Sequence, residues 1–446
     1  MSSSGTELFF IGAILSIALG FFTLKLIKKN EKLEWNEKIA GHLVALMFIT
    51  KGIHYASVGY FNQSFSDGTS TWQFWAQLLT ICDYAFGASI VMISLVYPVP
   101  FLRNKNQLKI AASIIVFVWL LVPLALDVTG NPWTALHLTG LLYIGAGLAW
   151  GTIYINFRLM NRTERNKSSL NIAVVCGLFL TLQMGHIWMM WPGMLLQSEY
   201  FYFIDLGAAP NGVDITSPLF DYLWLASYTF CIAVGFMILA VEIYQSINGE
   251  TSIMMYVMSF YFLVGAIGFA VFNAGSSTIF GLGDTTQSIQ ELWKTFTTQM
   301  HFTILRSLIA MYILLKYGFF NINDETKPIA KLMAIILIVV ATSATLELVQ
   351  SVIPINQMIT AALLGIIIAF GIGWEEKSFD TLVANPANIR DYVDKKWFPS
   401  MQLPDGLLKK IDYSYLIFVI VAVLISLIVW KTDGIVAVIM ERGGVN

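Results

Sequence analysis

The stretch IAGHLVALMFITKGIHYASVGYF, residues 39–61, is long and apolar enough to cross a lipid bilayer as one helix. It also carries Lys51 and, three residues later, His54. A charged residue near the middle of a membrane helix costs about 2.5–3.5 kcal/mol on insertion scales, so such residues face the bundle interior and pair with one another. The stretch therefore predicts a membrane helix and also a partner for Lys51.

The composition of the whole chain favours the same class of protein. Of the 446 residues, 57% are hydrophobic and only 12% are charged, whereas a soluble domain carries about 25% charged residues. We therefore expect an integral protein of the cell membrane, with the lipid bilayer as its first partner. No nucleic-acid partner is expected, because no basic patch with interleaved aromatic residues occurs; the net charge of −2 does not bear on this point.

Apolar segments of nearly the length that a helix needs to cross hydrocarbon recur along the chain. They predict an all-α, polytopic helix bundle with about 12 transmembrane helices in a single domain, residues 1–446. The predicted helices lie near 8–27, 39–61, 74–97, 109–126, 133–156, 171–195, 218–244, 253–274, 295–316, 332–352, 357–373 and 414–430.

The basic residues give this bundle an orientation. Twenty-one of the 26 lie in or at the edges of the odd-numbered connections between predicted helices. The even-numbered connections, near 62–72, 127–133, 196–218, 275–293 and 353–357, hold none. The positive-inside rule makes the odd connections cytoplasmic, so both the N-terminus and the C-terminus are expected outside. The longest connection, residues 374–413, then becomes a cytoplasmic surface loop that could contact a cytoplasmic or membrane protein partner.

Lys51 and Asp83 are expected to form an ion pair. Lys51 lies about ten residues below the outer end of its predicted helix, and Asp83 lies about nine residues below the outer end of the next one. At 1.5 Å per residue both are about 14 Å deep. A short connection makes the two helices antiparallel neighbours, and His54 shares a helix face with Lys51 because it follows three residues later.

The same depth argument places further polar residues in an outer-half layer. These residues are His137, His186, His301, Arg306 and Glu347, and Arg306 is expected to reach Glu347. Three interpretations remain open for the layer. The residues pin helices together, or they line an ion- or ligand-binding cavity, or histidines among His54, His137, His186 and His301 bind haem iron or copper. A retinal Schiff base on Lys51 is a further alternative. No cofactor is assumed.

Two fragments carry a family resemblance: LVYPVPFLRNKN, within residues 90–106, and LLKYGFFNINDETKPIAKLMAIILIVVATSATLE, within residues 312–376. They resemble membrane-embedded sensor regions of histidine-kinase-like proteins and archaeal multipass membrane proteins of unassigned function. The first is similar to the tyrosine-proline-basic turn of those regions, and the second to their "YGLFDIDL" junction. The resemblance implies a ligand-sensing bundle that signals through a separate partner.

These observations favour a sensory or receptor-like module that binds a small ligand or ion. The expected binding residues are Lys51, His54, Asp83, His186, His301, Arg306 and Glu347. A secondary transporter or channel for a small solute or cation is the main alternative, because membrane-depth charges also mark transport paths. A redox subunit holding haem or copper is a third alternative. Enzymatic activity is not expected, because the sequence has no P-loop, kinase signature, GxSxG or HExxH motif.

Overall fold

Every regular element that the structure describes is helical. The structure is a computed structural model, and it describes residues 3–30, 33–128, 132–160, 167–196, 218–276, 301, 305–317, 327–328, 330–332, 335, 403 and 406–431. Within these residues, eight helices are long and apolar enough to cross a membrane. The predicted all-helical, multipass class is therefore confirmed. The count of 12 helices and the side on which the termini lie stay predictions.

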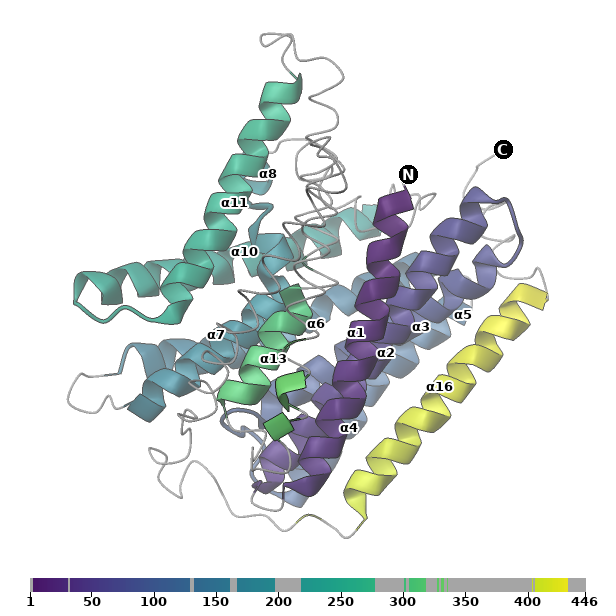
Figure 1. Ribbon diagram of the computed structural model, residues 1–446, viewed down its shortest axis with the longest axis horizontal. Helices are drawn as coiled ribbons and strands as arrows, with labels where there is room; N and C mark the ends of the chain where they lie inside the picture. Colours follow the sequence, from purple (N-terminus) through teal and green to yellow (C-terminus); the bar gives the residue numbers. More distant parts are fainter. Residues whose placement is uncertain are drawn as a thin grey trace. The chain divides into compact units, whose positions relative to one another are not determined.

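The described helices follow the predicted segments closely in the N-terminal half (Figure 1). Their bounds are α1 Ser3–Lys29, α2 Trp35–Ser66, α3 Trp72–Val96, α4 Lys105–Val116, α5 Val122–Val128, α6 Pro132–Arg158, α7 Lys167–Trp188, α8 Trp191–Leu195, α10 Pro218–Ile247, α11 Ile253–Ser276, α13 Arg306–Lys316 and α16 Leu407–Lys431. The predicted helices at 332–352 and 357–373 lie almost wholly outside the described residues, and so does most of the 374–413 loop.

Prolines explain two departures from the predicted helix bounds. The predicted helix at 171–195 is interrupted, because α7 ends at Trp188 and α8 starts at Trp191. Pro192 has no N–H to donate to the carbonyl of Trp188, so the helix cannot continue through this point. Between α4 and α5, the π-helical turn η1 (Phe117–Leu121) precedes Pro123. The wider turn lets the helix continue although Pro123 has no N–H to donate.

The last helix is longer than predicted. α16 starts at Leu407, seven residues before the predicted start at 414, so the end of the predicted 374–413 loop is helical. Gly406, with φ +73°, turns the chain into the helix, and its carbonyl accepts from the N–H of Lys410 at 2.9 Å. The first turns contain Lys409, Lys410 and Asp412. Because the prediction counted apolar residues, these charges moved the predicted start of the helix to 414.

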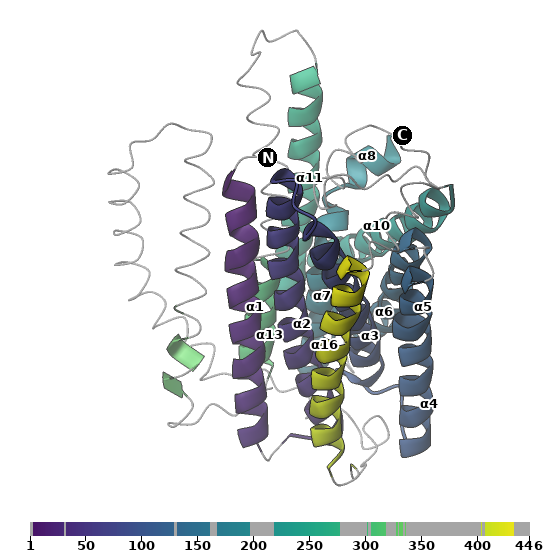
Figure 2. The same cartoon turned by 90° about the vertical axis from the view of Figure 1, so that its right-hand side faces the viewer.

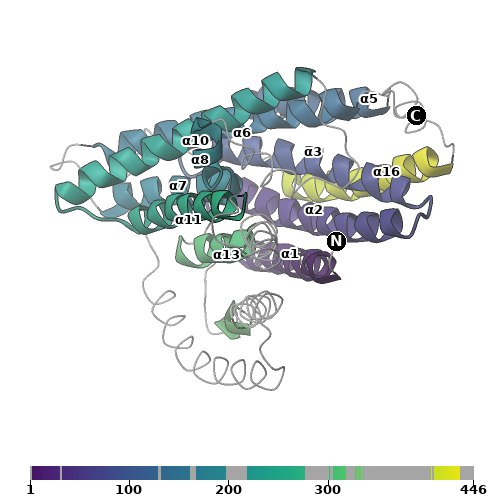
Figure 3. The ribbon, with the colours of Figure 1, turned by 90° about the horizontal axis from the view of Figure 1, so that it is seen from above.

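Contacts within the chain define two compact units. The first unit comprises residues 13–176, 210–231 and 389–446, and the second comprises residues 1–12, 177–209 and 232–388. In the first unit α3 is the central helix, and it contacts α2, α4, η1, α5, α6 and α16. Figures 2 and 3 show α16 alongside α2 and α3, although some 300 residues separate them in the chain.

Glycines set the spacing of α1 and α2 in the first unit. A Cβ added to Gly20 of α1 would lie 2.6 Å from the carbonyl oxygen of Ala45, and one added to Gly52 of α2 would lie 2.9 Å from that of Ala13. The two helices can lie this close only because both residues lack a side chain. Gly52 is the neighbour of Lys51 in the chain, so this close contact fixes the helix that carries the charge.

Aromatic rings and glycines also hold the second unit together. Trp191 of α8 donates from Nε1 to the carbonyl of Phe262 in α11 at 2.9 Å, and the two rings stack with centroids 6.1 Å apart. A Cβ on Gly235 of α10 would lie 2.7 Å from the ring of Trp188, the last residue of α7. These contacts join α7, α8, α10 and α11 within this unit.

Candidate functional site

The predicted ion pair between Lys51 and Asp83 is present. Lys51 Nζ lies 2.7 Å from Asp83 Oδ1, which joins the middle of α2 to the middle of α3 within the first unit. The Lys51 side chain is 9% exposed and the Asp83 side chain 26%. At this burial each charge alone would have a high desolvation cost, and the attraction between Lys51 and Asp83 offsets that cost.

Aromatic rings complete the surroundings of the Lys51 ammonium. Its Nζ lies 4.8 Å from the ring centroid of Phe86 and 5.5 Å from that of Tyr55. Ring faces attract a cation electrostatically within about 6 Å. The ammonium is thus enclosed by one carboxylate and two rings, whereas the Asp83 carboxylate is the more open half of the pair.

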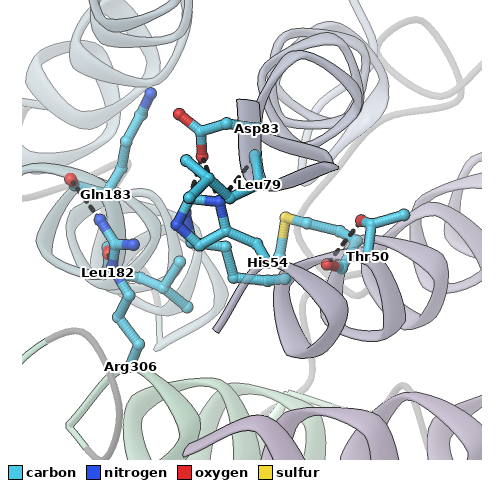
Figure 4. Close-up of polar contacts among 9 residues, drawn as sticks. Thr50, His54, Leu79, Asp83, Leu182, Gln183 and Arg306 are labelled. Atoms are coloured by element: carbon cyan, nitrogen blue, oxygen red, sulfur yellow. Dashed lines mark hydrogen bonds and ion pairs between the residues drawn. The ribbon is translucent and has the colours of Figure 1, made fainter. Parts of the chain in front are cut away.

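His54 lies against the same carboxylate, as its helix face predicts. Its Nδ1 is 2.9 Å from the carbonyl oxygen of Leu79 and 3.9 Å from Asp83 Oδ1 (Figure 4). A carbonyl oxygen only accepts, so Nδ1 carries the hydrogen and donates it. Lys51, Asp83 and His54 therefore form one group of three titratable side chains in the first unit, and we refer to it as the α2–α3 site.

A second polar group lies in the second unit. The ring of His301 lies 5.6 Å from that of His186, centroid to centroid, and the Tyr261 hydroxyl is 3.0 Å from His301 Nδ1. His186 is 2% exposed and His301 is fully buried. A Cβ on Gly185 would lie 2.7 Å from the Tyr261 ring and 2.9 Å from the His301 ring, so this glycine lets both rings reach α7. We refer to His186, Tyr261 and His301 as the α7–α11 cluster.

The side chain of Arg306 binds backbone carbonyls of α7. Its Nε donates to the carbonyl of Leu182 at 2.9 Å and its Nη2 to that of Gln183 at 3.4 Å (Figure 4). These carbonyls lie six and five residues before the end of α7, so the charged guanidinium binds the helix through carbonyls of its second-last turn. The predicted partner of Arg306, Glu347, lies outside the described residues, so that pairing stays a prediction.

The histidine interpretations have a mixed outcome. The structure brings His186 and His301 together, whereas His54 belongs to the α2–α3 site and the side chain of His137 is not among those described. Across the described ranges, no three His, Cys, Asp or Glu side chains are arranged to hold a metal ion. A haem or copper site therefore keeps only its sequence-based support.

Sequence reasoning missed two contributors to these groups and one buried histidine outside them. Tyr261 lies within the apolar segment that forms α11, so nothing in the sequence singles it out. The carbonyl of Leu79 is a backbone group, which every residue has. The buried histidine is His42, near the inner end of the predicted helix 39–61, and its Nδ1 donates to the carbonyl of Lys38 at 2.9 Å. The sequence signal for it was a polar residue within an apolar membrane segment, which predicts an interior-facing side chain, and this side chain is only 2% exposed.

No protein-family model matches this chain, and neither a curated protein nor a solved structure shows significant similarity to it. The candidate sites therefore rest on their own geometry.

Proposed function

We propose that the chain is a sensory or receptor-like module of the cell membrane that binds a small ligand or ion at the α2–α3 site. The observation that carries the proposal is the buried ion pair between Lys51 and Asp83, 2.7 Å apart on two packed helices. Ionisable residues inside membrane helices are costly and mark functional sites. The sequence resemblance to membrane-embedded sensor regions supports the sensory part of the proposal.

The unequal exposure of Lys51 and Asp83 supports a cationic ligand. Lys51 is enclosed by Asp83 and two aromatic rings, but the Asp83 carboxylate keeps 26% of its side-chain surface exposed. A cationic group, either a small metal ion or an amine, can approach this open side and compete with Lys51 for the carboxylate. Such a ligand would weaken the contact that joins α2 to α3, and a change in helix packing is what a sensor must pass to a partner. The 374–413 segment is the proposed place of contact with that partner.

A proton- or cation-coupled transporter is the second candidate. His54 Nδ1 lies 3.9 Å from Asp83 Oδ1, so two groups that can exchange protons flank Lys51. Chains of carboxylates and histidines at membrane depth are typical of proton-coupled pumps and transporters. The two candidates share the site and differ in whether the ligand crosses the membrane.

The proposal is tested by cation binding to the purified full chain. The thermal midpoint would be measured with sodium, potassium, calcium and ethanolamine as chlorides, for the unaltered protein, Asp83→Asn and Asp67→Asn. Asp67 is the matched control, because it is an exposed acid just beyond the end of α2. We expect at least one cation to shift the midpoint of the unaltered protein and of Asp67→Asn, but not that of Asp83→Asn.

The opposite pattern would exclude the α2–α3 site. If Asp83→Asn and Asp67→Asn respond equally to every cation, the carboxylate of Asp83 does not bind them. Uptake of the active cation into proteoliposomes then separates the candidates, because a transporter accumulates it and a sensor does not. A visible absorption band between 350 and 700 nm in protein from its native membrane would instead favour the haem or copper alternative.

A further inference from the structure

α16 lies along α3 (Figure 2) and packs on the turn of α3 that carries Asp83. One buried cluster joins the two helices, and its members are Leu78, Ile81 and Cys82 of α3 and Ala422 of α16. Cys82 directly precedes Asp83, so the surface that meets α16 belongs to the same helical turn as the carboxylate. Ala422 is 1% exposed, and its small side chain lets the two helices approach closely.

The same cluster includes α2 at the level of the α2–α3 site. Ile53, which lies between Lys51 and His54 in the chain, is partly buried and packs against the cluster. From α16, the residues that pack against it are Phe418, Val423 and Ile425. Closely packed side chains do not deform gradually, so a change in the spacing of α2 and α3 at this level changes the surface on which α16 packs.

Two polar contacts continue from this cluster toward the beginning of α16. Ser89 donates its hydroxyl hydrogen to the carbonyl of Ala85 at 2.8 Å, so in its hydrogen bond with Tyr415 the phenol is the donor. Three residues earlier in α16, Asp412 Oδ2 lies 2.8 Å from Lys28 Nζ of α1. The contacts of α16 with the first unit therefore run from the level of the α2–α3 site to the first turns of the helix.

α16 is held by a narrow stripe of its surface. Of its 25 residues, all of which the structure describes, the buried ones are Ala422, Ser426 and Val429. Large apolar side chains on its other faces are exposed, among them Ile417 at 60% and Ile428 at 62%. Segments with few buried apolar contacts open and shift at a low cost in free energy. The position of α16 therefore depends on a few contacts, and several of them are made with the two helices of the α2–α3 site.

We propose that α16 is the output helix of the α2–α3 site. The inference rests on the proposed function: a cation that draws Asp83 away from Lys51 lets α2 and α3 change their spacing, and the stripe that holds α16 then loosens. The first turns of α16, residues 407–413, move with it, and they belong to the 374–413 segment proposed for the partner contact. Because coupling is reciprocal, a partner that holds these turns in place weakens cation binding at Asp83.

The test is amide hydrogen exchange of the purified full chain in lipid nanodiscs, followed by mass spectrometry. Asp83→Asn removes the charge that binds Lys51, which is the change that a competing cation would make. We expect exchange in residues 407–431 to become about fivefold faster or more, while exchange in α11 of the second unit stays unchanged. Asp67→Asn is the matched control, because it removes an exposed acid just beyond the end of α2 and should leave α16 unchanged.

A second variant guards against an Asp83→Asn protein that fails to fold. Asp83→Glu keeps the charge, but its longer side chain displaces the contact with Lys51, so it should speed exchange in residues 407–431 to a smaller extent. Exchange in residues 407–431 that is equal in Asp83→Asn, Asp83→Glu and Asp67→Asn overturns the proposal.

Cations applied to the unaltered protein separate this proposal from the proposed function. If sodium, potassium, calcium or ethanolamine shifts the thermal midpoint of the unaltered protein but not that of Asp83→Asn, the same cation should speed exchange in residues 407–431. A cation that binds through Asp83 and leaves this exchange unchanged overturns the output role of α16, while the proposed function stands. If no cation binds, the proposed function fails, whereas faster exchange of α16 in the Asp83 variants still supports its coupling to the site.

Discussion

The α2–α3 site and the α7–α11 cluster both place polar side chains inside apolar helices, but different forces hold them. At the α2–α3 site, a cation and an anion on consecutive helices lie 2.7 Å apart. In the α7–α11 cluster, imidazole and phenol groups contact one another, and nearby Arg306 donates to two backbone carbonyls of α7. The first site depends on opposite formal charges. The second depends on hydrogen bonds and on the small size of Gly185.

The largest effect is expected from Asp83→Asn, which leaves the buried Lys51 ammonium without its counter-charge. Breaking a buried pair by removing one partner costs about 3–5 kcal/mol, and the partial exposure of Asp83 favours the lower end. The measurement is the free energy of unfolding in mixed micelles. The double variant Lys51→Met/Asp83→Leu should recover most of the loss, and a double variant no more stable than the single one would contradict the ion-pair account.

A smaller loss is expected from Arg306→Met. The substitution removes the 2.9 Å hydrogen bond to the carbonyl of Leu182, worth about 1.5–3 kcal/mol for a charged donor, and the longer, weaker one to the carbonyl of Gln183 at 3.4 Å. Arg306→Lys keeps the charge but cannot span both carbonyls, so it should restore stability only in part. If lysine restores it fully, the charge near the end of α7 matters and the two hydrogen bonds do not.

Gly185→Ala tests the close approach of the rings in the α7–α11 cluster. The added Cβ would lie under 3.0 Å from both Tyr261 and His301, and overpacking of this kind costs about 1–3 kcal/mol. Gly145→Ala in α6 is the matched control, because its Cβ would meet nothing closer than 3.8 Å. This control should gain up to about 1 kcal/mol from helix propensity. Equal effects of the two substitutions would show that Gly185 is not needed for packing.

The smallest effect is expected from Tyr261→Phe. It removes one neutral hydrogen bond to His301 Nδ1, worth about 1 kcal/mol, and keeps the ring that packs on Gly185. The same unfolding assay measures it. A loss as large as that of Asp83→Asn would mean that the α7–α11 cluster carries a charge after all, and the contrast between the two groups would fail.

Particular residues show which contacts can be predicted from the sequence and which cannot. The pair of Lys51 and Asp83 could be predicted because a short connection makes their helices antiparallel neighbours, and the two residues lie at similar distances from it along the chain. The approach of His186 to His301 could not be predicted, since the two residues are 115 positions apart and no periodicity links them. The interruption of the helix at Trp188 was open to prediction from Pro192, but the apolar run through Leu195 concealed it.

The sequence by itself determined the class of the protein, most of its described helices and the α2–α3 pair. These follow from apolar length and from the cost of charge in hydrocarbon, which act locally or between neighbours in the chain. Only the tertiary structure decided that α16 returns to α2 and α3, that Gly185 admits two rings, and that Asp412 of α16 pairs with Lys28 of α1. Such contacts join distant parts of the chain, and helix packing in a membrane depends on the fit of surfaces rather than on a pattern in either helix alone.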